Sequence, residues 1–189
     1  RYIEFSDKDR VALKTETVTA ENLAPWEVVV RNETSLVSAG TELSRLHGME
    51  EGQGFPARPG YAAIGRLVAK GGAVTDFELG QRVFYAGKHA DGQRFLHGQN
   101  HQWGRLYDVP EDIPSEDAPY VCLAQIAMTA PNITPIDLGD TVAVFGLGQI
   151  GNLAAQLYRF KGARVIALDP VAQRCDLARQ CGLEEVLQV

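Results

Sequence analysis

A glycine-rich turn late in the chain has the composition and spacing of a phosphate-binding site. Residues 146–151 read Gly-Leu-Gly-Gln-Ile-Gly and directly follow the apolar run 141–145. In such a turn the first glycine permits a sharp bend, the second lets a pyrophosphate approach the backbone, and the third lets the next helix pack closely on a sheet. That helix directs its unpaired N–H groups and positive dipole end at the phosphates. The motif predicts a dinucleotide site formed by Gly146, Leu147, Gly148, Gln149, Ile150 and Gly151.

An acidic residue follows at the spacing typical of binding to the adenosine ribose. Asp169 ends the apolar run 164–168 and lies 18 residues beyond Gly151, close to the ~20 expected for that role. Its charge would repel a 2′-phosphate, so NAD is predicted rather than NADP. Asp169 is also placed to cap the next helix, with Pro170 in the first turn, and the two roles are compatible. Arg174 weakens the NAD preference if it reaches the ribose edge, and is otherwise a solvated helix charge.

The elements around this turn alternate between strand and helix. Residues 149–160 repeat apolar side chains on one helical face, namely Ile150, Leu153, Ala154 and Leu157. The pattern predicts strands at 141–145, 164–168 and 185–189, with helices at 149–160 and 171–181, the second closed by Gly182. Such alternation indicates the beginning of a doubly wound parallel sheet.

The first 115 residues have a different character, because β-branched and aromatic residues alternate with Gly and Pro. Short strands are predicted at 28–30, 64–68 and 82–85, in an all-β, barrel-like domain, with a helical turn at 41–49. The polar segment 110–119 holds three prolines and marks a connection, and the uncharged segment 120–130 is interpreted as a buried helix. The fold class is α/β with a β-rich N-terminal domain, divided into residues 1–118 and 119–189.

The bulk composition is that of an ordinary globular protein. The chain has 189 residues, 45% hydrophobic and 22% charged, with a formal net charge of −6. An acidic chain repels phosphate backbones, so no nucleic-acid partner is expected. No apolar run approaches the ~20 residues that span a bilayer, and no signal-peptide pattern follows Arg1. Cys122, Cys175 and Cys181 form no disulfide framework, so a cytoplasmic location without membrane association is expected.

Taken together, these motifs resemble the medium-chain dehydrogenase/reductase superfamily, which includes the zinc alcohol dehydrogenases. The segments that carry the resemblance are 25–30, 59–65 with the spaced residues 68, 71, 74, 77, 80 and 83, and 138–140 before the glycine-rich strand. The resemblance spans nearly the whole chain and implies a GroES-like barrel followed by a Rossmann domain. A complete domain of that type has about six strands, so a truncated, N-terminal fragment with an exposed sheet edge is predicted.

The zinc-binding residues of that superfamily are replaced here. Ala39 stands where zinc members carry a catalytic cysteine, and Gly60-Tyr61-Ala62 stands where they carry Gly-His-Glu. The third ligand precedes a threonine that matches Thr129, which puts Gln125 in its place and Thr129 among the cofactor-binding residues. Alanine has no donor atom, and an amide is a poor zinc ligand beside thiolate or imidazole. The resemblance therefore implies no zinc, and is greatest to a zinc-less branch near the bacteriochlorophyllide dehydrogenase-like proteins.

Without a metal, the resemblance implies that side chains handle the substrate oxygen. Thr41 occupies the family's proton-relaying hydroxyl position, and Tyr61 brings a phenol that can donate to a developing alkoxide or enolate. Thr41 and Tyr61 are the candidate catalytic residues, although Tyr61 would equally fill the space that a metal leaves. Glu42 either orients Thr41 or forms a surface pair. His47 is a proton shuttle or a solvated loop residue.

A cluster of polar residues raises the question of a different metal. His89, Asp91, His97 and His101 fall within 13 residues, and His/Asp clusters bind metals. Their spacing matches no known zinc pattern and glycines surround them, which is typical of a polar surface loop. No metal is predicted.

Three functions remain open from the residues. The first is an NAD-dependent oxidoreductase that transfers hydride to or from an alcohol or carbonyl substrate without zinc. The second is a zinc-independent reductase of enones or quinones, and the third is a non-catalytic dinucleotide-binding protein. The expected partner is a small-molecule substrate, a homodimer or tetramer is expected for the full-length protein, and the fragment alone is expected to be inactive.

Overall fold

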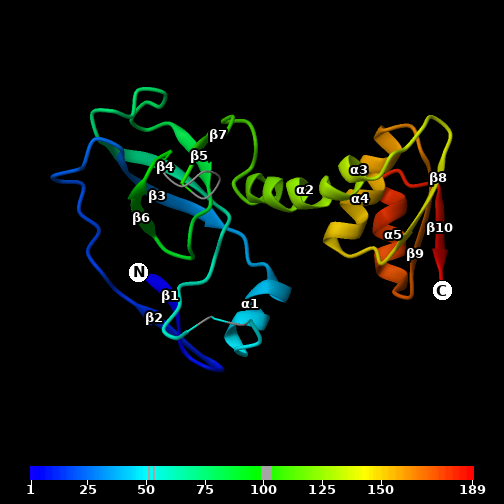
Figure 1. Ribbon diagram of the computed structural model, residues 1–189, viewed down its shortest axis with the longest axis horizontal. Helices are drawn as coiled ribbons and strands as arrows, with labels where there is room; N and C mark the ends of the chain where they lie inside the picture. Colours follow the sequence, from blue (N-terminus) through cyan, green and yellow to red (C-terminus); the bar gives the residue numbers. More distant parts are fainter. Residues whose placement is uncertain (51, 53, 99–103) are drawn as a thin grey trace. The chain divides into compact units, whose positions relative to one another are not determined.

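The computed structural model describes residues 1–50, 52, 54–98 and 104–189, which form two compact units, Arg1–Tyr120 and Val121–Val189 (Figure 1). Among the described residues no helix is long and apolar enough to cross a lipid bilayer. Each unit has a hydrophobic core of its own. The two units are therefore described separately.

Unit 1 is built on antiparallel strands. Its described residues form a hairpin and a five-stranded sheet in the order β6-β3-β4-β5-β7. The hairpin is β1 (Tyr2–Asp7) and β2 (Arg10–Lys14), and the sheet comprises β3 (Glu27–Ser35), β4 (Ala63–Lys70), β5 (Arg82–Tyr85), β6 (Gly92–Leu96) and β7 (Tyr107–Asp108). This is the predicted β-rich domain, and it has the GroES-like fold. One short helix, α1 (Ala39–Leu46), follows β3 and begins slightly before the helical turn predicted at 41–49.

Three successive valines of β3 are all buried, because both faces of this strand are covered. The pairing of β3 with β4 shifts register between Val29 and Val30 and again between Asn32 and Thr34. The extra residue at the first shift is Val68 of β4, so β3 keeps its alternation of faces. Val28 and Val30 join one core cluster, and Val29 is buried on the opposite face of the strand. The second bulge lies where the side chains of β3 become polar, and that end of β3 carries the residues discussed below.

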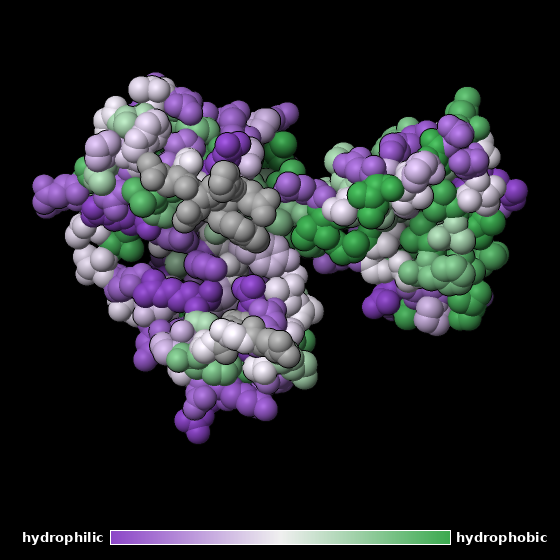
Figure 2. Space-filling view, in the orientation of Figure 1, coloured by the Kyte–Doolittle hydropathy of each residue, from purple (hydrophilic) through white to green (hydrophobic). Residues whose placement is uncertain are grey.

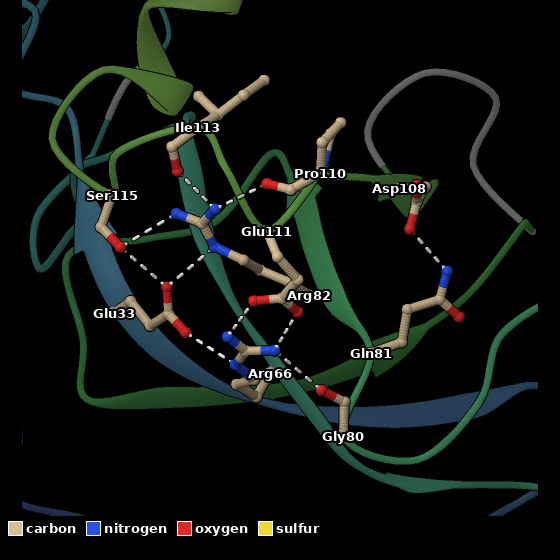
Figure 3. A network of polar contacts seen from close by, with 10 residues as sticks. All are labelled: Glu33, Arg66, Gly80, Gln81, Arg82, Asp108, Pro110, Glu111, Ile113 and Ser115. Atoms are coloured by element: carbon tan, nitrogen blue, oxygen red, sulfur yellow. Dashed lines mark hydrogen bonds and ion pairs between the residues drawn. The ribbon is translucent and has the colours of Figure 1, made fainter.

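A charged cluster fixes the proline-containing connection to the sheet (Figure 3). Arg82 is only 3% exposed and donates to Glu33, to the hydroxyl of Ser115 and to the carbonyl oxygens of Pro110 and Ile113. Buried guanidinium groups require several acceptors of this kind. Burial raises the pKa of Glu33, but hydrogen bonds from Ser115 and Arg82 and nearby positive charge hold it below its ordinary value. The cluster joins residues 110–115 firmly to β3 and β5.

Unit 2 begins a parallel α/β sheet. Its strands lie in the order β10-β9-β8, and its helices α4 and α5 lie on one side of the sheet (Figure 1). The elements are α2 (Val121–Ala127), α3 (Thr129–Ile133), β8 (Thr141–Phe145), α4 (Gln149–Phe160), β9 (Arg164–Asp169), α5 (Ala172–Gln180) and β10 (Glu185–Gln188), preceded by a 3-10 turn at Ala118–Tyr120. The predicted strand–helix alternation is confirmed, and Gly182 ends α5 with a φ of 86°.

The buried helix predicted at 120–130 is wrong in two respects. The helix is broken at Met128 into α2 and α3, and Val121, Ile126 and Met128 are exposed to solvent. Pro131 explains the break, because its ring lacks an N–H and clashes with the carbonyl four residues earlier, at Ala127. An uncharged composition therefore did not indicate burial here.

The predicted apolar face of residues 149–160 is only partly correct. The helix has the predicted bounds, but its fully buried residues are Asn152, Ala154, Ala155 and Tyr158. Ile150 is exposed, and Leu153 and Leu157 are half-buried. The buried side of α4 therefore combines small side chains with one tyrosine, whereas Ile150 turns toward solvent.

Unit 2 leaves much apolar surface uncovered. Figure 2 shows broad hydrophobic areas on unit 2, whereas the same view of unit 1 is mostly polar. Leu138, Phe145 and Phe160 are 91%, 77% and 78% exposed. Along β8 the burial alternates, with Thr141, Ala143 and Phe145 exposed and the intervening valines half-buried. Within the described part of unit 2, one face of this parallel sheet therefore lacks the cover that such sheets have on both sides.

Candidate functional site

The glycine-rich turn has the geometry expected of a phosphate cradle. Gly146 has a φ of 89°, which side-chain-bearing residues rarely adopt. A Cβ on Gly151 would lie 1.8 Å from the carbonyl oxygen of Gly146, so the helix and the turn touch backbone to backbone. A Cβ on Gly148 would meet nothing within 4 Å. Gly146 and Gly151 are thus required by the fold, whereas Gly148 borders open space.

One backbone amide of the turn donates to the protein, and others have no partner within the helix. Leu147 is 1% exposed, its side chain packs in the core, and its N–H donates to Asp169 at 2.7 Å. Gly148 is the N-cap of α4, so the N–H groups of the exposed Gln149 and Ile150 and of Gly151 have no partner within the helix. Together they make the positive end of the helix available to an anion.

A buried donor lies at the same helix start. Asn152 is 6% exposed and its Oδ1 accepts a hydrogen bond from Gln156, but its Nδ2 has no partner among the described residues. Buried amide groups are nearly always satisfied. The first turn of α4 therefore retains unused donor capacity.

Asp169 lies at the end of β9 and connects the turn to the next helix. It is 1% exposed, its Oδ2 accepts the N–H of Leu147, and its Oδ1 accepts the N–H of Val171 at 2.7 Å. These two hydrogen bonds, with the nearby charge of Arg174, hold the pKa of Asp169 below its ordinary value despite the opposing effect of burial. Asp169 is thus an anion that holds the backbone of Val171, the residue before α5, and also braces the glycine-rich turn; its side chain does not cap α5.

Two further predicted cofactor residues lie in the same unit. Nη1 of Arg174 lies 3.5 Å from Oδ2 of Asp169, and its side chain is 54% exposed. Thr129 is the first residue of α3 and is exposed. Arg174 is therefore placed beside the carboxylate that the sequence assigns to the ribose, whereas no described contact joins Thr129 to the turn.

In unit 1, α1 carries the predicted catalytic threonine. The Ser38 hydroxyl donates to Thr41 Oγ1 at 3.4 Å, and the Ser38 N–H donates to the carboxylate of Glu42 at 3.1 Å. Glu42 is 7% exposed, so its interpretation as a surface pair is wrong. The carboxylate faces inward because it has a buried partner, described next.

Glu42 belongs to a chain of three side chains that the sequence did not reveal. Nε2 of His89 lies 2.9 Å from Glu42 Oε1, and Nδ1 of His89 lies 2.8 Å from the Ser35 hydroxyl. The side chains of His89 and Glu42 are each 9% exposed. The three residues come from the end of β3, from α1 and from a loop after β5. No local spacing links them, and only the fold brings them together.

The loop that carries His89 is held from several sides. The side-chain amide of Asn32 donates to the carbonyl oxygens of Lys88 and Ala90, and its Oδ1 accepts from the Tyr85 hydroxyl. Gly60 packs on the loop so closely that a Cβ there would lie 2.7 Å from the backbone nitrogen of His89. The loop therefore has little freedom to move His89.

Tyr61, the other predicted catalytic residue, follows the glycine that packs on His89. It is half-buried, and no hydrogen bond of its hydroxyl is found among the described residues. Leu36 pairs with the backbone of Ala62 at 2.9 Å, so the segments that carry Ser35 and Tyr61 run side by side. The fold thus brings the Thr41, Tyr61 and His89 segments together in unit 1.

The residues considered for a metal have other partners. His89 binds Ser35 and Glu42, Asp91 pairs with Arg1 at 3.0 Å, and His97 Nδ1 accepts the N–H of Leu106. His101 lies outside the described residues. Over the described ranges no group of three or more His, Cys, Asp or Glu side chains is placed to hold a metal ion.

The remaining candidates are placed at the surface or partly buried. His47 pairs with Asp9 at 2.5 Å on an exposed surface. Gln125, at the third ligand position of the resemblance, is exposed on α2, and burial raises the pKa of the nearby Cys122 thiol. A raised thiol pKa disfavours the thiolate form that metals bind.

A GroES-like unit followed by a parallel sheet with a glycine-rich turn defines a class of two-domain dehydrogenases. No protein-family model matches the chain. It is 33% identical over 126 residues to D-guloside 3-dehydrogenase of Escherichia coli strain K12, which covers 66% of this chain and 35% of that protein. It is 26% identical over 202 residues to an alcohol dehydrogenase of Geobacillus stearothermophilus, covering 93% of this chain and 60% of the relative.

Solved structures give the same fold. The galactitol-1-phosphate dehydrogenase of Escherichia coli matches with a TM-score of 0.81 at 19% identity, over 99% of this chain and 60% of that one. Escherichia coli quinone oxidoreductase, solved with NADPH, matches with a TM-score of 0.79 at 19% identity, over 98% and 57%. The chain belongs to the medium-chain dehydrogenase/reductase superfamily of oxidoreductases. It spans about 35% to 60% of the length of these relatives.

Proposed function

We propose that the chain is the barrel and the adenosine-binding half of an NAD-dependent oxidoreductase that interconverts alcohols and carbonyl compounds without zinc. The observation that carries the proposal is the open space at Gly148, beside a turn whose other glycines are fixed by backbone contacts. The unpartnered amide of Asn152 adds a buried donor at the same helix start. These features fit a pyrophosphate held by residues 148–151.

The preference for NAD rests on Asp169. Its carboxylate is ionised near neutral pH, because two backbone N–H groups hold its pKa below the ordinary value. A fixed negative charge at the end of β9 accepts ribose hydroxyls and repels a 2′-phosphate. Arg174, 3.5 Å away, reduces that repulsion in part. The expected order of affinity is therefore NADH above NADPH, by a modest factor.

The side chains at the ligand positions do not suit zinc. Ala39 and Tyr61 occupy ligand positions of the resemblance, and neither supplies a thiolate or imidazole. A bound nicotinamide supplies or accepts hydride. Thr41 and Tyr61 then orient and hydrogen-bond the substrate oxygen, a task that hydroxyl groups perform in the absence of a metal.

The uncovered sheet face supports a larger active protein. A parallel sheet normally carries helices on both faces, yet Thr141, Ala143 and Phe145 face away from α4 and α5 into solvent. We propose that further polypeptide covers this face, extends the sheet from β8 and supplies the nicotinamide half of the site. The activity is then a property of the full-length natural polypeptide.

The experiment is a fluorescence titration of the full-length natural polypeptide with NADH and NADPH, followed by a panel of secondary alcohols, ketones, enones and quinones. The variant Gly148→Val should lower NADH affinity at least tenfold, because its side chain occupies the space assigned to the pyrophosphate. Its melting temperature should be unchanged, because a Cβ at that position meets no atom within 4 Å.

Unchanged NADH affinity in Gly148→Val would refute the cradle assignment. Turnover of enones or quinones alone would replace the alcohol/carbonyl assignment with the reductase alternative. NADH binding without turnover of any panel member would identify a non-catalytic dinucleotide-binding protein.

A further inference from the structure

The chain Ser35–His89–Glu42 has the ordered donors and acceptors of a proton relay. A carboxylate accepts hydrogen bonds and donates none, so the 2.9 Å contact with Glu42 places a proton on His89 Nε2. In the neutral imidazole Nδ1 is then an acceptor, and the 2.8 Å contact with Ser35 is an O–H···N hydrogen bond. The Ser35 hydroxyl is polarised by a base that is itself oriented by an acid.

The relay runs from the interior to a partly open end. Glu42 and His89 are buried, whereas Ser35 is half-buried. Because Oε1 of Glu42 also receives the N–H of Ser38, the carboxylate is fixed by two donors. A buried acid–imidazole pair that ends on the hydroxyl of a half-buried serine is an arrangement by which side chains move a proton.

The charged groups near His89 are few. Glu42 lies on α1, and Lys88 precedes His89 in the loop. Burial lowers the pKa of Lys88, Arg45 on α1 lowers it further, and Glu42 opposes both. Glu42 is the group in direct contact with the imidazole and compensates a positive charge on it.

We propose that Ser35, His89 and Glu42 form the proton relay of this oxidoreductase, with Ser35 as the group that faces the substrate hydroxyl. The inference rests on the proposed function. Glu42 adjoins Thr41 in α1, Ser38 bonds both Glu42 and Thr41, and Gly60 presses the Tyr61 segment against the His89 backbone. The relay thus reaches the same part of unit 1 as the two hydroxyl residues assigned to the substrate.

In the oxidative direction the relay removes the proton of the substrate hydroxyl. The substrate O–H bond breaks and its proton passes to Ser35 Oγ, while the original Ser35 proton passes to His89 Nδ1. The C–H bond gives its electron pair as hydride to the nicotinamide of the proposed function, and the substrate C=O bond forms. Glu42 stabilises the imidazolium, which later loses its proton to water. Reduction uses the same residues in reverse.

The first test needs no cofactor or substrate. Long-range ¹H–¹⁵N spectra of the full 189-residue chain, labelled at its four histidines, report which ring nitrogen carries the proton. In its neutral form, His89 should carry it on Nε2, with Nδ1 shifted as a hydrogen-bond acceptor. In Ser35→Ala, that Nδ1 shift should move toward the value of a free nitrogen. A proton on Nδ1, or a spectrum unaffected by Ser35→Ala, would overturn the relay.

The second test uses the full-length natural polypeptide and the most active alcohol or carbonyl of the panel. Ser35→Ala and His89→Gln should lower kcat by about 100-fold, the scale of general acid–base catalysis, with little change in KM or NADH affinity. Both should raise the solvent deuterium isotope effect on kcat relative to the unaltered protein, because proton transfer becomes the slower step. Ser35→Thr keeps the hydroxyl and should restore most of kcat. Ser115→Ala, a serine that bonds charged groups in the Arg82 cluster, is the matched control and should leave kcat unchanged.

The outcomes separate this proposal from the proposed function. If the unaltered full-length protein does not bind NADH, or turns over no member of the panel, the proposed function is refuted and the relay with it. Turnover in the unaltered protein with unchanged kcat in folded Ser35→Ala refutes the relay alone. A fall in kcat that Ser35→Thr does not restore marks Ser35 as a packing residue and also refutes the relay.

Discussion

The glycine-rich turn of unit 2 and the Ser35–His89–Glu42 chain of unit 1 are built in opposite ways. The turn presents backbone N–H groups, and its decisive residues are those without side chains, such as Gly146 and Gly151. The chain in unit 1 consists of side chains from three separate segments. A site made of backbone groups requires that each position tolerate its conformation and its close contacts. A site made of side chains requires that the whole fold bring the separate residues together.

This difference predicts where single substitutions act. A change in the turn should damage the local backbone of unit 2 and leave unit 1 intact. A change in the barrel chain should alter chemistry with little effect on stability, provided that the residue is small. The charged cluster around Arg82 is a third kind of region. Its side chains are polar, but they stabilise the fold and take no part in the proposed chemistry.

The largest effect is expected for Gly151→Ala. The added methyl carbon would lie 1.8 Å from the carbonyl oxygen of Gly146, so the start of α4 must shift. Forcing atoms into such a contact costs about 3 kcal/mol or more. Hydrogen exchange measured by mass spectrometry should show loss of protection across residues 141–189. Protection in unit 1 should be unchanged.

Gly148→Ala is the matched control, since the same methyl group there meets nothing. Its protection should equal that of the unaltered chain. If the two alanine variants show the same hydrogen-exchange protection, the proposed contrast is wrong. That contrast is between Gly151, which packing requires, and Gly148, which borders the space assigned to the pyrophosphate.

The next effect is expected for Arg82→Met. Methionine matches much of the arginine volume but removes donors to Glu33, Ser115 and the two carbonyl oxygens. Removing one member of a buried charged network costs on the order of 3–5 kcal/mol. Urea unfolding followed by the fluorescence of unit 1 should show this loss.

Arg66→Met is the control for the Arg82 cluster. Arg66 pairs with the same Glu33 and with Glu111, but its side chain is 33% exposed, and exposed pairs contribute little. Its loss of stability should be clearly smaller than that of Arg82→Met. Equal losses would mean that burial does not distinguish the two arginines.

The two regions also differ in how far the sequence reveals them. Residues 141–169 were predicted with nearly the observed bounds, because hydrophobic periodicity and glycine spacing are local signals. The helix at 120–130 was misjudged because Pro131 interrupts it, and Ile150 was assigned to the buried face of α4 although it is exposed. The sequence predicted the helices and strands of this region, but it did not predict how their side chains pack.

The barrel chain could not be predicted for a related reason. His89 was considered only with its neighbours in sequence, Asp91 and His97, whereas its partners Ser35 and Glu42 lie 54 and 47 residues away. Those contacts depend on the register of β3 with β4 and on its bulge between Asn32 and Thr34. No periodicity of a single sequence specifies where a bulge falls.

The smallest effect is expected for Arg174→Ala. This substitution compares a backbone-held residue, Asp169, with an exposed side chain beside the same turn. Asp169 is fixed by backbone N–H groups, so removing an arginine that is 54% exposed should leave stability nearly unchanged. The substitution unmasks the carboxylate, which then repels a 2′-phosphate more strongly. The ratio of NADH to NADPH affinity in the full-length natural polypeptide should rise several-fold, almost entirely through weaker NADPH binding. A fall in that ratio would mean that Arg174 supports NADH binding directly, and that cofactor choice at this site depends on this exposed side chain as well as on Asp169.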